Sequence, residues 1–234
     1  MLANRYRNLL FIVVFINSLY ADNLTTKLEL SFIETSGNTN TSSLSGKIET
    51  NKKINKAEIK AKASIFRSKD NDEESANKYD AELKYDHMLG EKFYIYLGTN
   101  FVKDEFSDYD SRLNIGPGLG YKFVNTDKHL IDIQSGFDYS VDKFKDKEQE
   151  EYFASRSELN YKYKIKDDIE FKQMISYLKS LKVKERYFIT SQTEINIEII
   201  DKLSLGLSYK IDYVNQTEKE KTDKKFLTSI KYEF

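Results

Sequence analysis

The sequence predicts an all-β protein, a transmembrane antiparallel β-barrel of about twelve strands that follows an N-terminal signal peptide. Three observations support this fold class. Apolar and polar residues alternate with period two through most of the chain. None of the positions on the predicted apolar faces is charged, although 32% of all residues are. Longer charged connections alternate with short turns, as they do between the two ends of an outer-membrane barrel.

The first 21 residues have the pattern of a secretory signal peptide. Arg5 and Arg7 precede the apolar run 9–16, and a short polar region then ends at the small residue Ala21. The apolar run is too short to span a bilayer as a helix. We therefore expect cleavage after Ala21, a barrel over residues 22–234, and export to the bacterial outer membrane.

The barrel is expected to contain about twelve segments of alternating polarity. In chain order, their apolar faces begin at Leu24, Leu44, Ala57, Tyr79, Phe93, Leu113, Ile131, Leu159, Ile169, Tyr187, Leu203 and Phe226. Short turns are expected at 35–40 and 52–56, and long charged loops at 68–77, 104–110, 142–151 and 215–224.

The last segment has the clearest alternation. Phe226, Ile230, Tyr232 and Phe234 lie on one face of an extended strand, and the sequence ends at an aromatic residue. This ending resembles the closing strand of outer-membrane barrels, whose final aromatic residue is part of the signal read by the barrel-assembly machinery. Tyr232 and Phe234 are the predicted assembly signal.

Charged residues on the polar faces would line the lumen of such a barrel. These residues are Lys27, Glu29, Lys47, Glu49, Glu58, Lys60, Lys62, Asp80, Glu82, Lys84, Arg112, Lys122, Asp132, Asp138, Arg156, Glu158, Lys162, Glu170, Lys172, Glu194, Lys210, Asp212 and Lys231. Both signs occur in near balance, and charges in a narrow lumen must pair because an unpaired buried ion is costly. The pattern predicts a salt-bridged interior without strong preference for anions or cations.

Aromatic residues gather near the ends of the apolar faces, which predicts two girdles. Pro117 lies within a predicted strand, where it cannot donate to the ladder, so we expect a local bulge there. Gly116, Gly118 and Gly120 would leave the inner wall thin at this point, either as a gap for a partner side chain or as a site of strand curvature.

A soluble sandwich or barrel with the apolar faces turned inward is the main structural alternative. A closed sheet of about twelve strands, however, has a lumen too wide for side chains to fill with a dry core. A sandwich could bury such faces, but it explains neither the terminal aromatic residues nor the unequal connections.

Two stretches resemble a known family. The segments 34–44 (ETSGNTNTSSL) and 109–121 (YDSRLNIGPGLGY) resemble the DUF481 family, putative salt-induced outer-membrane proteins of Gram-negative bacteria. This resemblance covers nearly all of the mature chain. It implies an outer-membrane barrel and brings no established activity or catalytic residues.

Enzymatic activity is not expected. The two histidines, His87 and His129, lie at predicted turns of different hairpins, and neither is paired by spacing with a serine. The acidic stretches around 70–74 and 104–110 lack the glycine and distal glutamate of a calcium loop, so no metal site or cofactor is predicted. A second possibility is that divalent cations weakly link these acidic loops to lipopolysaccharide phosphates.

The sequence is compatible with two functions. One is a narrow channel for ions or small polar solutes, or a role in the envelope response to salt, the latter implied by the resemblance alone. The other is a structural or surface-interaction barrel with a closed lumen that acts through its charged loops. The expected partners are outer-membrane lipid, lipopolysaccharide and the assembly machinery. Nucleic acid is not expected because the net charge is only −1, and the barrel is expected to be a monomer.

Overall fold

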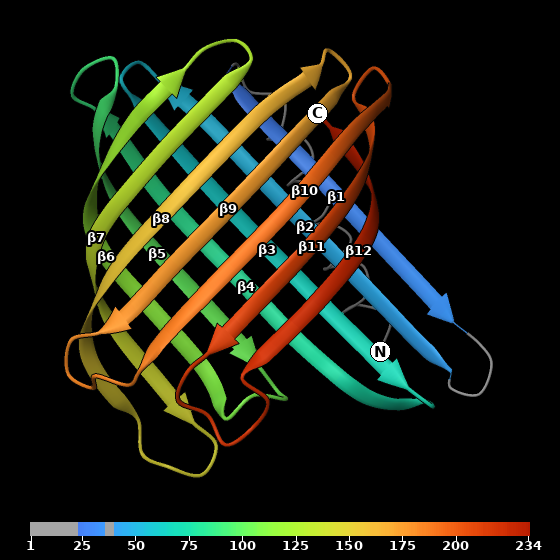
Figure 1. Ribbon diagram of the computed structural model, residues 1–234, viewed down its shortest axis with the longest axis vertical. Coiled ribbons are helices and arrows are strands. Elements are labelled where there is room, and N and C mark those ends of the chain that lie inside the picture. The colour runs from blue at the N-terminus through green and yellow to red at the C-terminus, as the bar shows by residue number, and fades with distance from the viewer. Residues whose placement is uncertain (1–22, 36–39) are drawn as a thin grey trace, which may run out of the picture.

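The computed structural model describes residues 23–35 and 40–234, so the predicted signal peptide at 1–21 lies outside the described residues. The described chain forms a closed barrel of twelve antiparallel strands, each paired with its neighbours in sequence, with β1 closing on β12 (Figure 1). The strands are β1 (Leu24–Thr35), β2 (Thr41–Ile54), β3 (Ala57–Asp70), β4 (Glu73–Met88), β5 (Phe93–Asp104), β6 (Tyr109–Asn125), β7 (His129–Phe144), β8 (Glu150–Lys166), β9 (Ile169–Ser180), β10 (Tyr187–Ile200), β11 (Leu203–Val214) and β12 (Thr222–Glu233). The predicted fold class and strand number are confirmed.

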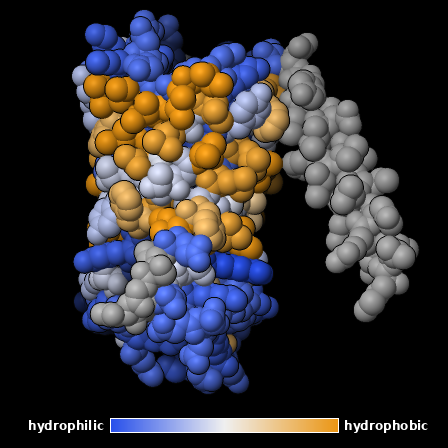
Figure 2. Space-filling model, turned by 90° about the vertical axis from the view of Figure 1, so that its right-hand side faces the viewer, coloured by the Kyte–Doolittle hydropathy of each residue, from blue (hydrophilic) through white to orange (hydrophobic). Residues whose placement is uncertain are grey.

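The barrel is apolar outside and polar inside, as the alternation predicts. On β7, Ile133, Phe137 and Tyr139 are 40%, 63% and 39% exposed, whereas Asp138 and Ser140 between them are fully buried. Over the described residues, thirty-three large hydrophobic side chains are exposed and seven hydrophobic residues are buried. Figure 2 shows the resulting apolar band between two polar ends. Such a surface fits a lipid environment and not water.

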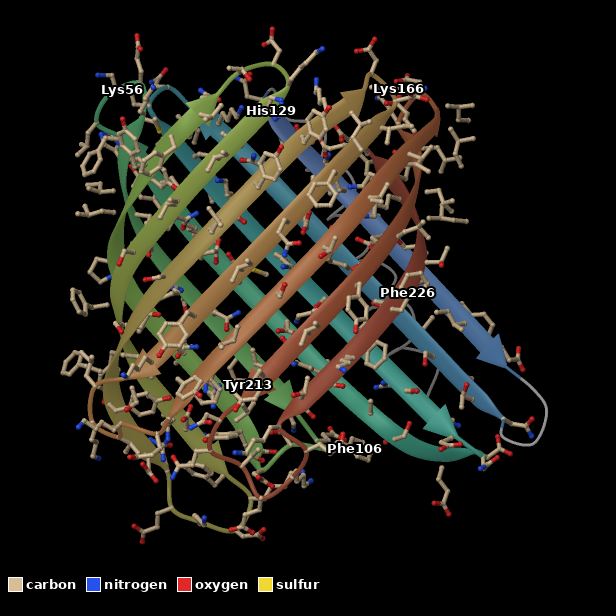
Figure 3. The ribbon with its side chains drawn as sticks, in the orientation of Figure 1. Lys56, Phe106, His129, Lys166, Tyr213 and Phe226 are labelled. Atoms are coloured by element: carbon tan, nitrogen blue, oxygen red, sulfur yellow. The ribbon has the colours of Figure 1, made fainter. Side chains whose placement is uncertain are left out.

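The two ends of the barrel differ. At the turn end, strands are joined by two to four residues, and Lys56, His129 and Lys166 lie there (Figure 3). At the loop end, described connections of up to seven residues include 105–108, 145–149, 181–186 and 215–221. No helix with the length and apolar character needed for a membrane crossing occurs within residues 23–35 and 40–234.

The prediction of a long charged loop at 68–77 is wrong. β3 continues to Asp70 and β4 begins at Glu73, so the connection is only Asn71–Asp72. Both residues have positive φ, 49° and 67°, as a type I′ hairpin requires, and Asn and Asp tolerate this conformation. The loops predicted at 104–110 and 142–151 are likewise shorter than expected, because the strands run further into the charged stretches.

The predicted bulge at Pro117 is also wrong. Pro117 pairs with Leu97 on β5, and the β6–β7 register is the same at Ile115–Tyr139 as at Gly118–Gly136. The inner wall is not thin at the neighbouring glycines either. A Cβ atom at Gly118 or Gly120 would come within 2.2 Å of Tyr96 Cζ or 2.0 Å of Tyr94 Cζ. These glycines therefore make room for two tyrosine rings of β5.

Aromatic side chains meet along both ends of the apolar band. At the loop end, Tyr187 lies between Tyr177 and Tyr213, with ring centroids 5.8 and 6.0 Å away. At the turn end, Tyr232 and Phe234 pack edge to face at 4.9 Å. Rings with one polar atom are suited to the boundary between lipid and water.

Candidate functional site: the charged interior of the barrel

The charged residues that the sequence assigns to the lumen lie on the inner face of the barrel. They lie next to buried polar residues or to other charged residues on adjacent strands. Glu29 lies beside Lys47, Glu49 beside Lys62, and Lys62 beside Glu82 on successive strands. Residues directly opposite in an antiparallel pair share a face, so opposite charges meet in these pairs on β1 to β4. The interior is therefore an ionic network.

One network lies where the barrel closes. Lys47 Nζ is 2.8 Å from Glu29 and 3.3 Å from Glu49. Lys231 on β12 contacts Glu29, at 3.4 Å, and Glu194 on β10. Glu29 also accepts a hydrogen bond from Ser229, at 2.7 Å. These contacts join β1, β2, β10 and β12 on the inside of the wall.

A second network lies towards the turn end. Lys60 Nζ is 3.1 Å from Glu58 and 2.9 Å from Asp86, and Lys84 Nζ is 3.3 Å from Asp86. Lys84 also donates to Gln134, at 2.6 Å. Nearby, Tyr94 donates its hydroxyl proton to Asp132, at 2.8 Å, and the Lys122 ammonium lies 6.0 Å from the Tyr94 ring.

Other predicted residues pair between neighbouring strands. Arg156 contacts Asp138 at 3.2 Å, and Asp138 is fully buried. Glu170 contacts Lys172, at 2.9 Å, and Lys162. Of the other members of the predicted set, Lys27 pairs with Glu233 at 2.6 Å, and Glu158 accepts from Asn160 at 2.7 Å.

One ion pair crosses the lumen. Lys78 Nζ on β4 lies 3.2 Å from Asp212 Oδ2 on β11, although five steps separate these strands around the barrel. Asp212 also holds Lys210 at 3.2 Å and accepts from Thr190 at 2.8 Å. Because β4 and β11 lie on different sides of the barrel, the two side chains reach across the lumen and narrow it.

Beyond that pair, an aromatic cluster lies inside the loop end. Tyr109, Tyr152, Ala154, Leu178 and Phe188 pack together there. The Arg112 guanidinium covers this cluster, 3.4 Å from the Phe188 ring centroid and 4.4 Å from that of Tyr109. Arg112 is held by Asp142, at 2.6 Å. At this end of the barrel, packed side chains therefore occupy the interior, which is polar elsewhere.

Two loops meet across the mouth at the same end. Asp108, before β6, accepts hydrogen bonds from Thr217 Oγ1 and from the Glu218 amide, the latter at 2.9 Å. Lys219 Nζ donates to the Phe106 carbonyl at 2.6 Å, and Tyr109 donates to that of Gln216 at 3.2 Å. We call these contacts between 106–109 and 216–219 the loop bridge. β6 and β12 are six steps apart in the barrel, so the bridge spans the opening.

Burial by itself would raise the pKa of the Asp108 carboxyl, but the hydrogen bonds from Thr217 and Glu218 and the nearby Lys219 ammonium hold this pKa below the ordinary aspartate value. Asp108 is therefore an ionised acceptor at neutral pH. Hydrogen bonds to a charged acceptor are stronger than those between neutral groups, which favours the bridged arrangement of the loops.

Between the loop bridge and the barrel interior lies a cavity of about 630 Å³. Its basic lining residues are Lys62, Lys78, Arg112, Arg156, Lys210, Lys219, Lys221 and Lys225. Its acidic lining residues are Asp80, Glu82, Asp104, Asp138, Glu158, Asp212, Glu220 and Asp223. Eight charges of each sign line the cavity, so it carries no net excess of one sign that would select anions or cations.

Several important interior residues were absent from the predicted set. On β4, Lys78 and Asp86 are each two residues from a predicted inward residue, Asp80 and Lys84, and therefore face inward as well. Asp142 lies on the same face of β7 as Asp138. Longer predicted strands would have included all three residues. Arg186 lies in a loop and reaches Glu150, at 2.8 Å. No sequence pattern indicates that contact.

The histidines lie on separate strands near the turn end. His87 is near the end of β4 beside Tyr85, and His129 begins β7, where its Nδ1 is 3.1 Å from the Tyr161 hydroxyl. Among residues 23–35 and 40–234, no group of three or more histidine, aspartate or glutamate side chains is arranged to hold a metal ion. The expectation that the protein is not an enzyme remains a prediction.

An outward apolar band, an ionic interior and short turns at one end define a porin-like transmembrane β-barrel. Residues 28–234 match the family described as "Protein of unknown function, DUF481", and the chain belongs to this family. The predicted family is confirmed, whereas the salt-induced role in its expected description is not.

Comparison with known proteins agrees with this class. The chain is 22% identical over 208 residues to the uncharacterized protein YdiY of Escherichia coli strain K12, covering 88% of this chain and 81% of YdiY. It is similar in structure to the COG4313 outer membrane channel from Pseudomonas putida F1, with a TM-score of 0.54, 9% identity, and coverage of 90% and 94%. The translocator domain of the autotransporter NalP from Neisseria meningitidis gives a TM-score of 0.50, 10% identity, and coverage of 99% and 96%. At these identities, the structures support the fold alone.

Proposed function

We propose that the protein lies in the bacterial outer membrane as a monomeric, narrow channel for ions or small polar solutes, closed at rest towards its loop end. The observation that carries this proposal is the charged cavity of about 630 Å³, which is lined by the Lys78–Asp212 pair and by residues of the loop bridge. The proposed location rests on the outward apolar band.

The charges suggest weak selectivity. A passing ion would meet acids and bases in equal number along the cavity, so neither sign is concentrated there. A small solute carrying both charges, or a neutral polar solute, would find hydrogen-bonding partners throughout. Large solutes are excluded by the pair that crosses the lumen.

The same pair supports a response to salt. Lys78 and Asp212 are 14% and 16% exposed, so salt entering the cavity would weaken their attraction only in part. The exposed ends of the loop bridge would be screened more strongly. We propose that higher ionic strength favours the open channel, which is how a role in the envelope response to salt would arise.

Planar-bilayer recording of the refolded protein tests the proposal. Lys78→Ala/Asp212→Ala removes both members of the crossing pair and should increase single-channel conductance. Lys162→Ala/Glu170→Ala, which removes a pair between neighbouring strands, is the matched control and should leave conductance unchanged. Silence of the wild type and of both variants over a range of salt concentrations would contradict a channel.

The second candidate is a structural or surface-interaction barrel. The observation in its favour is the loop bridge, which joins opposite walls and orders the charged surface at the mouth. Under this candidate, Asp108→Ala would alter binding to lipopolysaccharide without producing conductance. We also propose that the assembly machinery recognises Tyr232 and Phe234 at the end of β12.

A further inference from the structure

The wall of the barrel is incomplete where it closes. β1 and β12 pair over only five residues, Lys27–Ser31 with Ser229–Glu233, whereas other neighbouring strands pair over eleven to fourteen. Within the described chain, the β1 edge at 32–35 and the β12 edge at 222–228 have no partner across this junction. Figure 1 shows the two strands running apart towards the loop end.

The paired part is too short to seal a bilayer. Five residues cover about 15 Å along a strand, and less along the bilayer normal because barrel strands are tilted, whereas the apolar band of such a barrel is about 25 Å tall. Phe32 and Phe226, beside the gap, are 63% and 59% exposed, and Phe226 lies partway up the outer wall (Figure 3). The gap therefore opens within the apolar band.

The inner surface changes character at the gap. Where the strands pair, Lys27 contacts Glu233, Ser229 donates to Glu29, and Lys231 contacts Glu29. Where they part, the inward positions on the two strands are Ile33 and Leu227. The aromatic ring of Phe66 lies on the inner wall nearby and the Lys225 ammonium lies 4.9 Å from its centroid. Phe66 and Leu227 thus place a small apolar patch within an otherwise charged inner wall.

This patch communicates with the lumen. Leu227 and Phe66 line a cavity of about 110 Å³. This cavity shares with the larger cavity of the interior the residues Lys62, Lys78, Asp80, Glu82, Asn100, Lys210 and Lys225. Unpaired strand edges are not tolerated in hydrocarbon unless they line a water-filled space or lie within protein. A hydrated lumen behind the gap satisfies that condition.

We propose that the β1–β12 junction is a lateral portal that joins the lumen to the lipid bilayer and admits a lipid acyl chain to Leu227 and Phe66. Acyl chains are the molecules that an apolar opening would meet on this face. The inference rests on the proposed membrane location. The portal has a natural closed form, because continuing the present register would pair Phe32 with Thr228, Ile33 with Leu227 and Glu34 with Phe226.

Tryptophan fluorescence can test the portal because the native chain has no tryptophan and no cysteine. Phe226→Trp and Leu227→Trp place single reporters on adjacent residues that face outward and inward. Met174→Trp is an inward control on β9, where the wall is continuously paired. Each variant is reconstituted in vesicles of phosphatidylcholine with brominated acyl chains, and a heat-modifiable gel band verifies folding.

The portal predicts strong quenching for both Phe226→Trp and Leu227→Trp and little for Met174→Trp. A closed wall, with quenching of Phe226→Trp alone, would overturn the portal and leave the membrane location intact. If Phe226→Trp is not quenched either, the proposed location itself is wrong.

An engineered disulfide provides an independent test of the portal. Phe32→Cys/Thr228→Cys, added to Leu227→Trp, should close the junction on oxidation, because these residues become cross-strand neighbours in the closed form. Oxidation should then reduce the quenching of Leu227→Trp to the level of Met174→Trp, and reduction should restore it. Unchanged quenching after complete oxidation would also overturn the proposal.

Discussion

Gly120 on β6 lies directly beneath the ring of Tyr94 on β5, so close that a Cβ atom at Gly120 would come within 2.0 Å of Tyr94 Cζ. Tyr96 lies over Gly118 in the same way. The two rings lie flat against the wall, and Tyr94 and Tyr96 are 2% and 4% exposed. These close contacts between β5 and β6 lie on the side of the barrel away from the β1–β12 junction.

Gly120→Ala should therefore destabilise the barrel. We expect a loss of about 1–3 kcal/mol in the free energy of unfolding, typical of overpacking, measured by urea titration in detergent. Gly90→Ala is the control, because a Cβ atom there meets nothing within 4 Å. Adding Tyr94→Ala should make Gly120→Ala harmless relative to Tyr94→Ala alone. Equal losses at both glycines would contradict the close approach of the ring.

The loop bridge should open in acid. The pKa of Asp108 is lowered in the bridged state, so the bridge is fully stabilised above the ordinary aspartate pKa of about 3.9 and is lost as pH falls through the lower, bridged value. A spin label at Lys221→Cys should become more mobile over this range. With Asp108→Ala, the label should be mobile at neutral pH and insensitive to acid. A pH response that survives in this variant would assign the titration to another group.

The aromatic cluster should contribute to stability and close the loop end. Phe188 is 9% exposed beneath Arg112, so Phe188→Ala should lower the free energy of unfolding by about 3–5 kcal/mol. It should also raise conductance in a planar bilayer if the proposed channel passes this point. Phe153→Ala is the control, since Phe153 faces outward and is 63% exposed. A stability loss no larger than in this control would count against the cluster.

Phe234, which follows β12, should matter for assembly if the proposed assembly signal is correct. Phe234 donates its backbone N–H to Thr26 at 2.8 Å, and its ring packs on Tyr232, so Phe234→Ala removes the aromatic contact and leaves the backbone bond. We expect a lower yield of heat-modifiable barrel in cells, with unchanged folding in detergent. Phe123→Ala, another exposed aromatic residue near the turn end, should insert normally. Equal yields would argue against the proposed assembly signal.

Sequence alternation predicts most of the fold, because a strand has only two faces and lipid excludes charge from one of them. The same rule could not predict that Asn71 and Asp72 form a tight hairpin within a charged stretch, or that the ladder passes Pro117 without a bulge. For the interior, parity assigns residues to a face but not to partners. The Lys78–Asp212 pair depends on barrel closure, which brings together strands distant in sequence.

The apolar faces of these strands look outward and the ionic faces inward. Sedimentation velocity of residues 22–234, folded in detergent and then freed of it, tests this claim most directly. We expect large, heterogeneous aggregates once detergent is removed, because thirty-three large hydrophobic side chains are exposed among the described residues. A single compact species that stays dissolved without detergent would contradict it.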